Sequence, residues 1–151
     1  MEDIFEQNSN TQPVRPSGLK TISILSFLGS GSSLLANLFV FLFYGTFVSY
    51  LSSDEIKEAS MAFDAEMLEK FAVTAGQSYF LISAVLYSVS LFGVYLMWHL
   101  VKKGIHFYAI AQISLLLLPL LFIDSSLSIL PGLILSGTFI FLYSRFLNVM
   151  K

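Results

Sequence analysis

The sequence predicts an all-α membrane protein, a bundle of four transmembrane helices with a short amphipathic helix between the first and the second. Of its 151 residues, 56% are apolar and 12% are charged, and the mean hydropathy is +0.77. A soluble domain is typically about 45–50% apolar and about 25% charged. This chain therefore cannot cover its own surface with polar groups, and we expect lipid to solvate part of it. Its apolar residues also fall into long runs that contain few charges, as membrane-spanning helices require.

The apolar runs predict the four helices in order. They occupy residues 19–51, 72–101, 105–123 and 127–147. The first run is longer than the roughly 20 residues that a membrane core requires, so we expect this helix to tilt or to project into water. Residues 1–18 form a polar tail that cannot bury a core, and we expect disorder there. The membrane domain is thus predicted over residues 19–151.

Residues 52–70 differ from the runs around them because they are acidic and amphipathic. Apolar residues recur at a spacing of three to four, at Ile56, Phe63, Met67 and Phe71, which is typical of a helix with one apolar face. We expect a short extracytoplasmic helix that lies on lipid, on its own bundle or on a partner protein. Ile56, Phe63 and Met67 are the candidate partner-docking residues. The alternative is an extension of a neighbouring transmembrane helix.

The distribution of charge predicts the orientation. With four spans, six basic residues lie on one side, namely Arg15, Lys20, Lys102, Lys103, Arg145 and Lys151, against Lys57 and Lys70 on the other. Cytoplasmic loops carry the excess of Lys and Arg. We therefore expect a multi-pass protein of the inner (cytoplasmic) membrane with both termini in the cytoplasm.

Small residues mark the helix faces that we expect to pack. Close backbone approach drives helix association in lipid, where the hydrophobic effect does not act. The first and fourth runs carry small residues spaced four apart, and the candidate helix-packing residues are Gly29, Ser30, Gly31, Ser33, Gly132 and Ser136. We expect Gly29 and Gly31 in particular to lie at a helix–helix contact. The alternative is that these residues are ordinary members of membrane helices.

Three amides fall inside or near the spans. We expect Asn37, Gln77 and Gln112 to form hydrogen bonds across helices. Together with Tyr87, they would line a polar path if the protein were an oligomeric transporter or channel. Most ionisable residues lie outside the spans, whereas a proton-coupled transporter is expected to bury a carboxylate.

The composition also bears on the chemistry that we expect. The sequence holds no cysteine and two histidines, His99 and His106, and two histidines without a carboxylate form a poor metal site. We expect neither metal nor cofactor, no enzymatic activity and, with a formal charge of −2, no nucleic-acid partner. Lys102 and Lys103 are candidates for holding an anionic lipid head group.

Two stretches carry a resemblance to a known group of proteins. Arg15-Pro16 precedes an apolar run that ends in Gly29-Ser30-Gly31, and Trp98 is followed by Lys102-Lys103-Gly104 and then by Ala111-Gln112-Ile113. These stretches resemble small four-span membrane proteins of Bacteroidota, a family of unknown function. The resemblance implies a four-span inner-membrane fold and no particular activity.

The function that we expect is therefore non-catalytic. The leading hypothesis is an interaction partner or accessory subunit of an envelope complex, with a membrane protein, a periplasmic protein or a second copy of the chain as partner. The alternative is the oligomeric transporter or channel described above.

Overall fold

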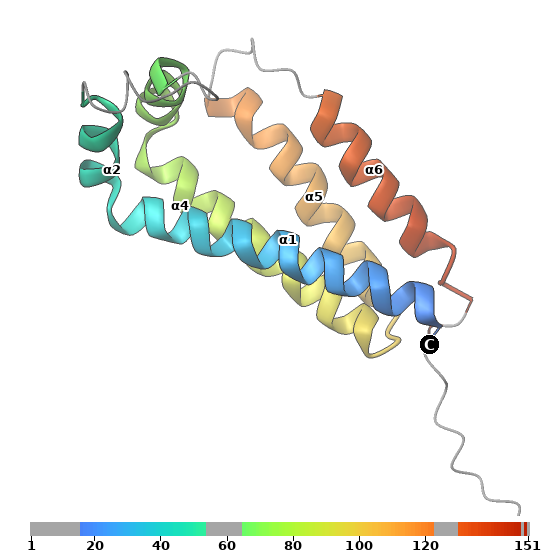
Figure 1. The fold of residues 1–151 in the computed structure, drawn as a ribbon. Helices are drawn as coiled ribbons and strands as arrows, with labels where there is room; N and C mark the ends of the chain where they lie inside the picture. Colours follow the sequence, from blue (N-terminus) through green and yellow to red (C-terminus); the bar gives the residue numbers. More distant parts are fainter. Residues whose placement is uncertain (1–15, 54–64, 123–129, 149, 151) are drawn as a thin grey trace, which may run out of the picture.

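The computed structural model describes residues 16–53, 65–122, 130–148 and 150, and all the regular structure in these ranges is helical. The helices are α1 (Ser17–Leu42), α2 (Tyr44–Leu51), α4 (Ala65–Trp98), α5 (Lys103–Phe122) and α6 (Leu130–Ser144). α1, α4 and α5 are long and apolar enough to cross a membrane, and α6 is a shorter apolar helix. Figure 1 shows these four helices side by side along one bundle.

The first apolar run does not form the single long helix predicted for residues 19–51. α1 ends at Leu42, and Phe43 has φ −113° and ψ 29°, outside the helical region, before α2 begins at Tyr44. At 1.5 Å per residue α1 is about 39 Å long, enough for a hydrocarbon core of about 30 Å. The remaining residues of the apolar run form α2, which turns away at the end of the bundle (Figure 1).

α4 is two helical limbs joined at Gly76. This glycine has φ 70° and ψ 169°, a conformation that side chains with a Cβ rarely adopt. The first limb is residues 65–75, and the second limb, residues 77–98, crosses the bundle. The predicted amphipathic helix over residues 52–70 is therefore described only from Ala65 onward, where it is continuous with this first limb.

Two apolar cores lie at opposite ends of the bundle. One contains Leu19, Val94, Met97, Tyr108 and Tyr143, and joins the start of α1, the α4–α5 turn and the end of α6. We call this the basic end, because the exposed side chains of Lys20, Lys102, Lys103 and Arg145 surround it. Figure 1 shows these three parts of the chain at the same end.

The second core forms what we call the cap end. Leu51 of α2 and Ala72 and Phe80 of α4 are buried there, with Phe41 and Phe71 packed against them. The Tyr44 hydroxyl donates a hydrogen bond of 3.0 Å to the Ala72 carbonyl. α2 and the first limb therefore pack against each other as one folded cap on the bundle.

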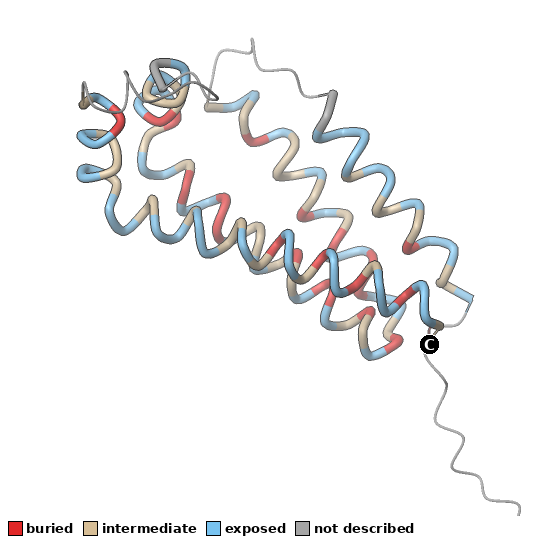
Figure 2. Tube along the Cα trace, viewed as in Figure 1, coloured by how far each residue is buried: buried red, intermediate tan, exposed pale blue. Residues whose placement is uncertain are grey.

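The four helices of the bundle are buried to different extents. α4 packs mainly against α1 and α5, whereas α6 contacts α5 and α1 far less. Figure 2 shows buried positions repeated along α4 and α5, whereas α6 is mostly exposed or intermediate, with one buried position near its end. Large apolar side chains such as Leu28, Leu35, Leu121 and Phe141 are exposed, and lipid would cover them in a membrane.

The closest approach of two helices is between α4 and α5. A Cβ on Gly93 would lie 2.7 Å from the Tyr108 nitrogen and 2.8 Å from the Gly104 oxygen, and a Cβ on Gly104 would lie 2.6 Å from the Gly93 oxygen. Two backbones meet here because neither residue has a side chain. Gly104 falls between the predicted helices 72–101 and 105–123, but it lies in the first turn of α5 at this contact.

The contact predicted at Gly29 and Gly31 is not where the helices approach most closely. A Cβ on either residue would meet no atom within 4 Å, and Gly29 is exposed. The neighbouring Ser30 is buried against α4 instead. The physical reason is that α1 turns Ser23, Ser26 and Ser30, which can form hydrogen bonds, toward the bundle and leaves both glycines in open space.

We expect Gly93→Ala to destabilise the fold by about 1–3 kcal/mol, the usual cost of inserting a methyl group into a closed contact. Thermal unfolding in mild detergent measures the change. Gly31→Ala is the matched control and should unfold like the wild type. Equal stability of the Gly93→Ala variant would show that α4 and α5 are further apart than described here.

Candidate functional site

A chain of hydrogen bonds joins all four long helices at mid-depth. The Ser30 hydroxyl of α1 and the Ser90 hydroxyl of α4 lie 3.1 Å apart. The Gln112 amide of α5 donates to the Ser90 hydroxyl at 3.2 Å, and the Ser136 hydroxyl of α6 donates to the Gln112 carbonyl oxygen at 3.1 Å. Gln112 is the centre of this chain, because its side-chain nitrogen donates one of these hydrogen bonds and its side-chain oxygen accepts another.

The position of this polar layer follows from the sequence of each helix. Ser30, Gln112 and Ser136 each lie near the middle of their helix, and Ser90 lies just past the middle of the second limb of α4. Water is scarce at this depth of a bilayer, so unpaired polar groups are costly there. The serines and the amide are therefore stabilised chiefly by one another.

A cleft opens beside this layer. Its volume is about 180 Å³, and it is lined by Leu25, Ser26, Gly29, Ser30, Ser33, Tyr87, Tyr108, Gln112, Leu135, Ser136 and Phe139. α1 and α6 form its two sides, and residues of α4 and α5 lie between them. Every lining side chain is uncharged, so the described part of the cleft suits a neutral occupant.

A cluster of hydroxyl groups closes the cleft toward the basic end. Tyr143 donates a hydrogen bond of 2.9 Å to the Ser26 hydroxyl, and the rings of Tyr108 and Tyr143 pack edge to face with centroids 5.3 Å apart. The Ser23 hydroxyl, about one turn from Ser26, is buried and has no hydrogen-bond partner among the described residues. This cluster ties α1 to α6 below the cleft.

The structure separates the four residues predicted to line one polar path. Tyr87 and Gln112 both line the cleft. Gln77 donates to the Phe41 carbonyl at 2.9 Å near the cap end, so the cross-helix bonds predicted for Gln77 and Gln112 are confirmed. The prediction for Asn37 is wrong, because its amide donates within α1, to the Ser33 carbonyl at 2.8 Å.

The candidate packing residues also fall into different roles. Ser30 and Ser136 belong to the hydrogen-bond chain, while Gly29 and Ser33 line the cleft. A Cβ on Gly132 would lie 3.2 Å from the Leu116 side chain, so this glycine of α6 faces α5.

Three residues of the site were missed by sequence analysis. Ser90, Tyr108 and Tyr143 carry the layer and the hydroxyl cluster, yet each stands in an apolar run. One usable signal was the spacing of Ser83 and Ser90, because residues seven apart lie on the same face of a helix. Both serines are buried in the structure.

The candidate docking residues are only partly described. Met67 lies on the first limb of α4 and is 54% exposed, whereas Ile56 and Phe63 lie outside the described residues. Leu68 and Phe71 of the same limb pack on the cap core. The Ser52 hydroxyl donates to the Glu69 carboxylate at 2.7 Å, which also holds the limb against α2.

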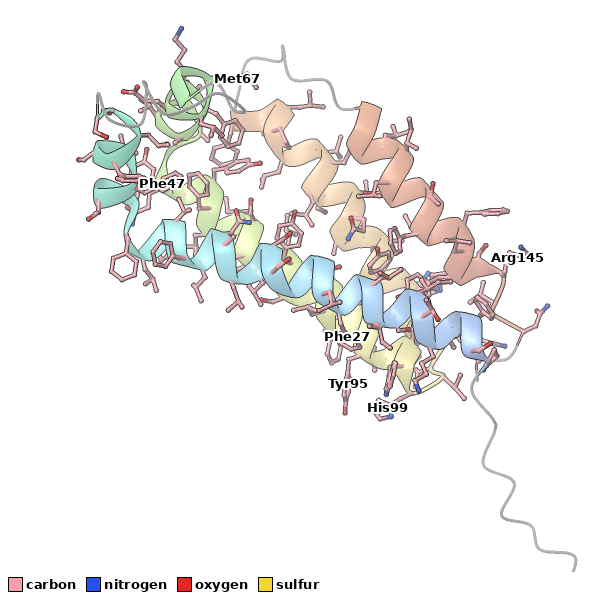
Figure 3. The ribbon with its side chains drawn as sticks, in the orientation of Figure 1. Phe27, Phe47, Met67, Tyr95, His99 and Arg145 are labelled. Atoms are coloured by element: carbon pink, nitrogen blue, oxygen red, sulfur yellow. The ribbon has the colours of Figure 1, made fainter. Side chains whose placement is uncertain are left out.

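The basic residues lie at the other end. Lys102 and Lys103 are exposed at the α4–α5 turn. His99 packs edge-on against Tyr95, with ring centroids 4.6 Å apart, and Figure 3 shows both side chains at the basic end. In the described ranges, no three residues among His, Asp and Glu come together as a metal site.

No protein-family model, curated protein or solved structure matches this chain. The resemblance to four-span proteins of Bacteroidota therefore stays a prediction, and the function has to be argued from geometry.

We expect Gln112→Leu to destabilise the protein by about 1 kcal/mol, because two interhelical hydrogen bonds are lost at about 0.6 kcal/mol each. Unfolding titrations in detergent micelles measure this loss. Asn37→Leu is the control, since its amide bonds only within α1, and it should cost less. If both variants were equally stable, the polar layer would not hold the helices together.

Proposed function

We propose that this protein is a non-catalytic interaction partner or accessory subunit of an envelope complex, held in the inner membrane by four spans with both termini in the cytoplasm. α6 is the proposed fourth span. Its 15 described residues cover about 22 Å at 1.5 Å per residue, and a hydrocarbon core is about 30 Å thick. The span therefore requires residues before Leu130 or a locally thinner bilayer.

The arrangement of charge supports the orientation. Lys20, Lys102, Lys103 and Arg145 surround one core of the bundle, at the end where α1 begins and α6 ends. Figure 3 shows Arg145 and His99 at this end and Met67 at the opposite end. By the positive-inside rule the basic end faces the cytoplasm, and the cap then faces the other compartment.

A reporter fused after Lys151 should therefore behave as cytoplasmic. An alkaline phosphatase fusion should be inactive, and a green fluorescent protein fusion should be fluorescent. The same two reporters fused after Ser53, at the cap end, are the control and should give the opposite result, an active phosphatase and no fluorescence. An active phosphatase after Lys151 would contradict either the four-span count or the orientation.

The observation that carries the interaction role is the folded cap. α2 and the first limb of α4 are fixed by their own core and by the Tyr44 and Ser52 hydrogen bonds. Met67 stands on this rigid support with more than half of its surface exposed. An exposed apolar side chain on a folded extramembrane element is a suitable anchor for a partner, because the backbone that carries it is already ordered before binding.

A transporter or channel is the second candidate. The observation in its favour is the mid-depth cleft, where Tyr87 and Gln112 supply two of the four predicted path residues. Gln77 lies nearer the cap end, bonded to Phe41. Such a role would require an oligomer that extends the polar layer from one surface to the other.

We expect Met67→Ser to release proteins that co-purify with the wild type in mild detergent, while the chain itself stays folded. Val73→Ser is a close control, because Val73 lies on the same limb and is 56% exposed, compared with 54% for Met67. Quantitative mass spectrometry of the purified samples compares the two. Retention of every wild-type partner by Met67→Ser would contradict docking at this residue. An unfolded Met67→Ser protein would show instead that the side chain supports the cap.

A further inference from the structure

The cleft between α1 and α6 is held open by the contacts that hold the bundle together. Its inner wall is fixed by the bonds from Ser30 through Ser90 and Gln112 to Ser136. The Tyr143–Ser26 bond fixes the end nearest the cytoplasm in the proposed orientation. A ligand would therefore meet walls that are already in place, which lowers the entropy cost of binding.

The lining offers free hydrogen-bonding groups at mid-depth. Ser33 and Tyr87 are among the residues that line the cleft, and among the described residues neither hydroxyl has a hydrogen-bond partner. Both residues are half-buried, and water at this depth of a bilayer is too scarce to supply a partner reliably. A ligand with a carbonyl or hydroxyl oxygen would satisfy them, and the uncharged lining selects a neutral one.

The volume of the cleft and its aromatic lining residues suit a ring. A cavity of roughly 150 Å³ lined by apolar side chains accommodates benzene, and this cleft has a volume of about 180 Å³. The aromatic rings of Tyr87, Tyr108 and Phe139 all line it, and they would pack on a flat ring face or edge. A ring with a few oxygen substituents fits this volume, whereas a whole lipid or a helix does not.

The opening faces the lipid side of the bundle. Gly29 of α1 and Leu135 of α6 line the cleft and are both exposed. A Cβ on Gly29 would meet no atom within 4 Å, so the side formed by α1 is unobstructed. A molecule dissolved in the bilayer would enter sideways between α1 and α6 and leave an apolar tail in the lipid.

From these observations we propose that the cleft binds a neutral, membrane-dissolved molecule whose head is a single ring bearing carbonyl or hydroxyl oxygens, the chemistry shared by quinones and phenolic lipids. The site is separate from the cap and goes beyond the accessory role proposed above.

The test uses the full chain in phosphatidylcholine nanodiscs, with a decyl-substituted benzoquinone as the probe and empty nanodiscs as the background. We expect saturable binding of about one probe per chain, measured by extraction and absorbance, with a rise in the unfolding temperature. The matching quinol, tested under reducing conditions, distinguishes a carbonyl-bearing from a hydroxyl-bearing ring. 1-Decanol, which has a hydroxyl and a chain but no ring, should compete at least tenfold more weakly.

Two glycine variants make the test specific. Gly29→Leu places a side chain at the opening and should abolish saturable binding. Gly31→Leu is the matched control, because Gly31 also has open space around it but does not line the cleft, and it should bind like the wild type. Tyr87→Phe keeps the ring and removes the hydroxyl, so we expect about fivefold weaker binding, the usual effect of one hydrogen bond.

Several results would overturn the proposal. Binding no greater than in empty nanodiscs would do so, as would undiminished binding by Gly29→Leu or equal competition by 1-decanol. If Gly29→Leu failed to fold, unchanged affinity in a Ser33→Ala/Tyr87→Phe double variant would decide against it. These outcomes are independent of the cap, because Met67→Ser should bind the probe like the wild type.

Discussion

The fold depends on one amide in the middle of the membrane bundle. Gln112 accepts a hydrogen bond from Ser136 and donates one to Ser90, which is in turn bonded to Ser30. Apolar burial cannot select the order of helices that are all surrounded by apolar lipid, so polar contacts and close packing must do so. This chain of hydrogen bonds joins α1, α4, α5 and α6 at one level, and it fixes their relative rotation.

The close contact of Gly93 and Gly104 complements the polar layer. It brings α4 and α5 to backbone contact near the basic end, where the Tyr108–Tyr143 ring pair and the Tyr143–Ser26 bond then add α6 and α1. At the cap end the corresponding role belongs to the Leu51–Ala72–Phe80 core. All four helices thus meet at the basic end, whereas the cap core is formed by α1, α2 and α4 and contains no described residue of α6.

The cleft follows from this distribution of contacts. α6 is bonded to α5 at Ser136 and to α1 only nearer the basic end, at Tyr143. On the side of α1 that faces this gap lie Gly29 and Ser33, which are too small to fill it. Small residues that normally permit two helices to meet here leave a space with polar walls, and this is the feature on which the ligand proposal depends.

The sequence by itself determined the membrane character, the apolar runs and the places where polar amides interrupt them, because these depend on composition and periodicity alone. It also predicted that Gln77 and Gln112 bond across helices, since a lone amide in lipid has few other partners, but the same reasoning failed for Asn37, which bonds within α1. Tertiary structure decided the rest. Whether Gly29 or Gly93 is the contact depends on helix rotation, which small residues on several faces leave open. The break between α1 and α2 at Phe43 and the kink in α4 at Gly76 depend on how the cap packs. The cleft exists only once four helices are placed together, because each of them supplies only part of its lining.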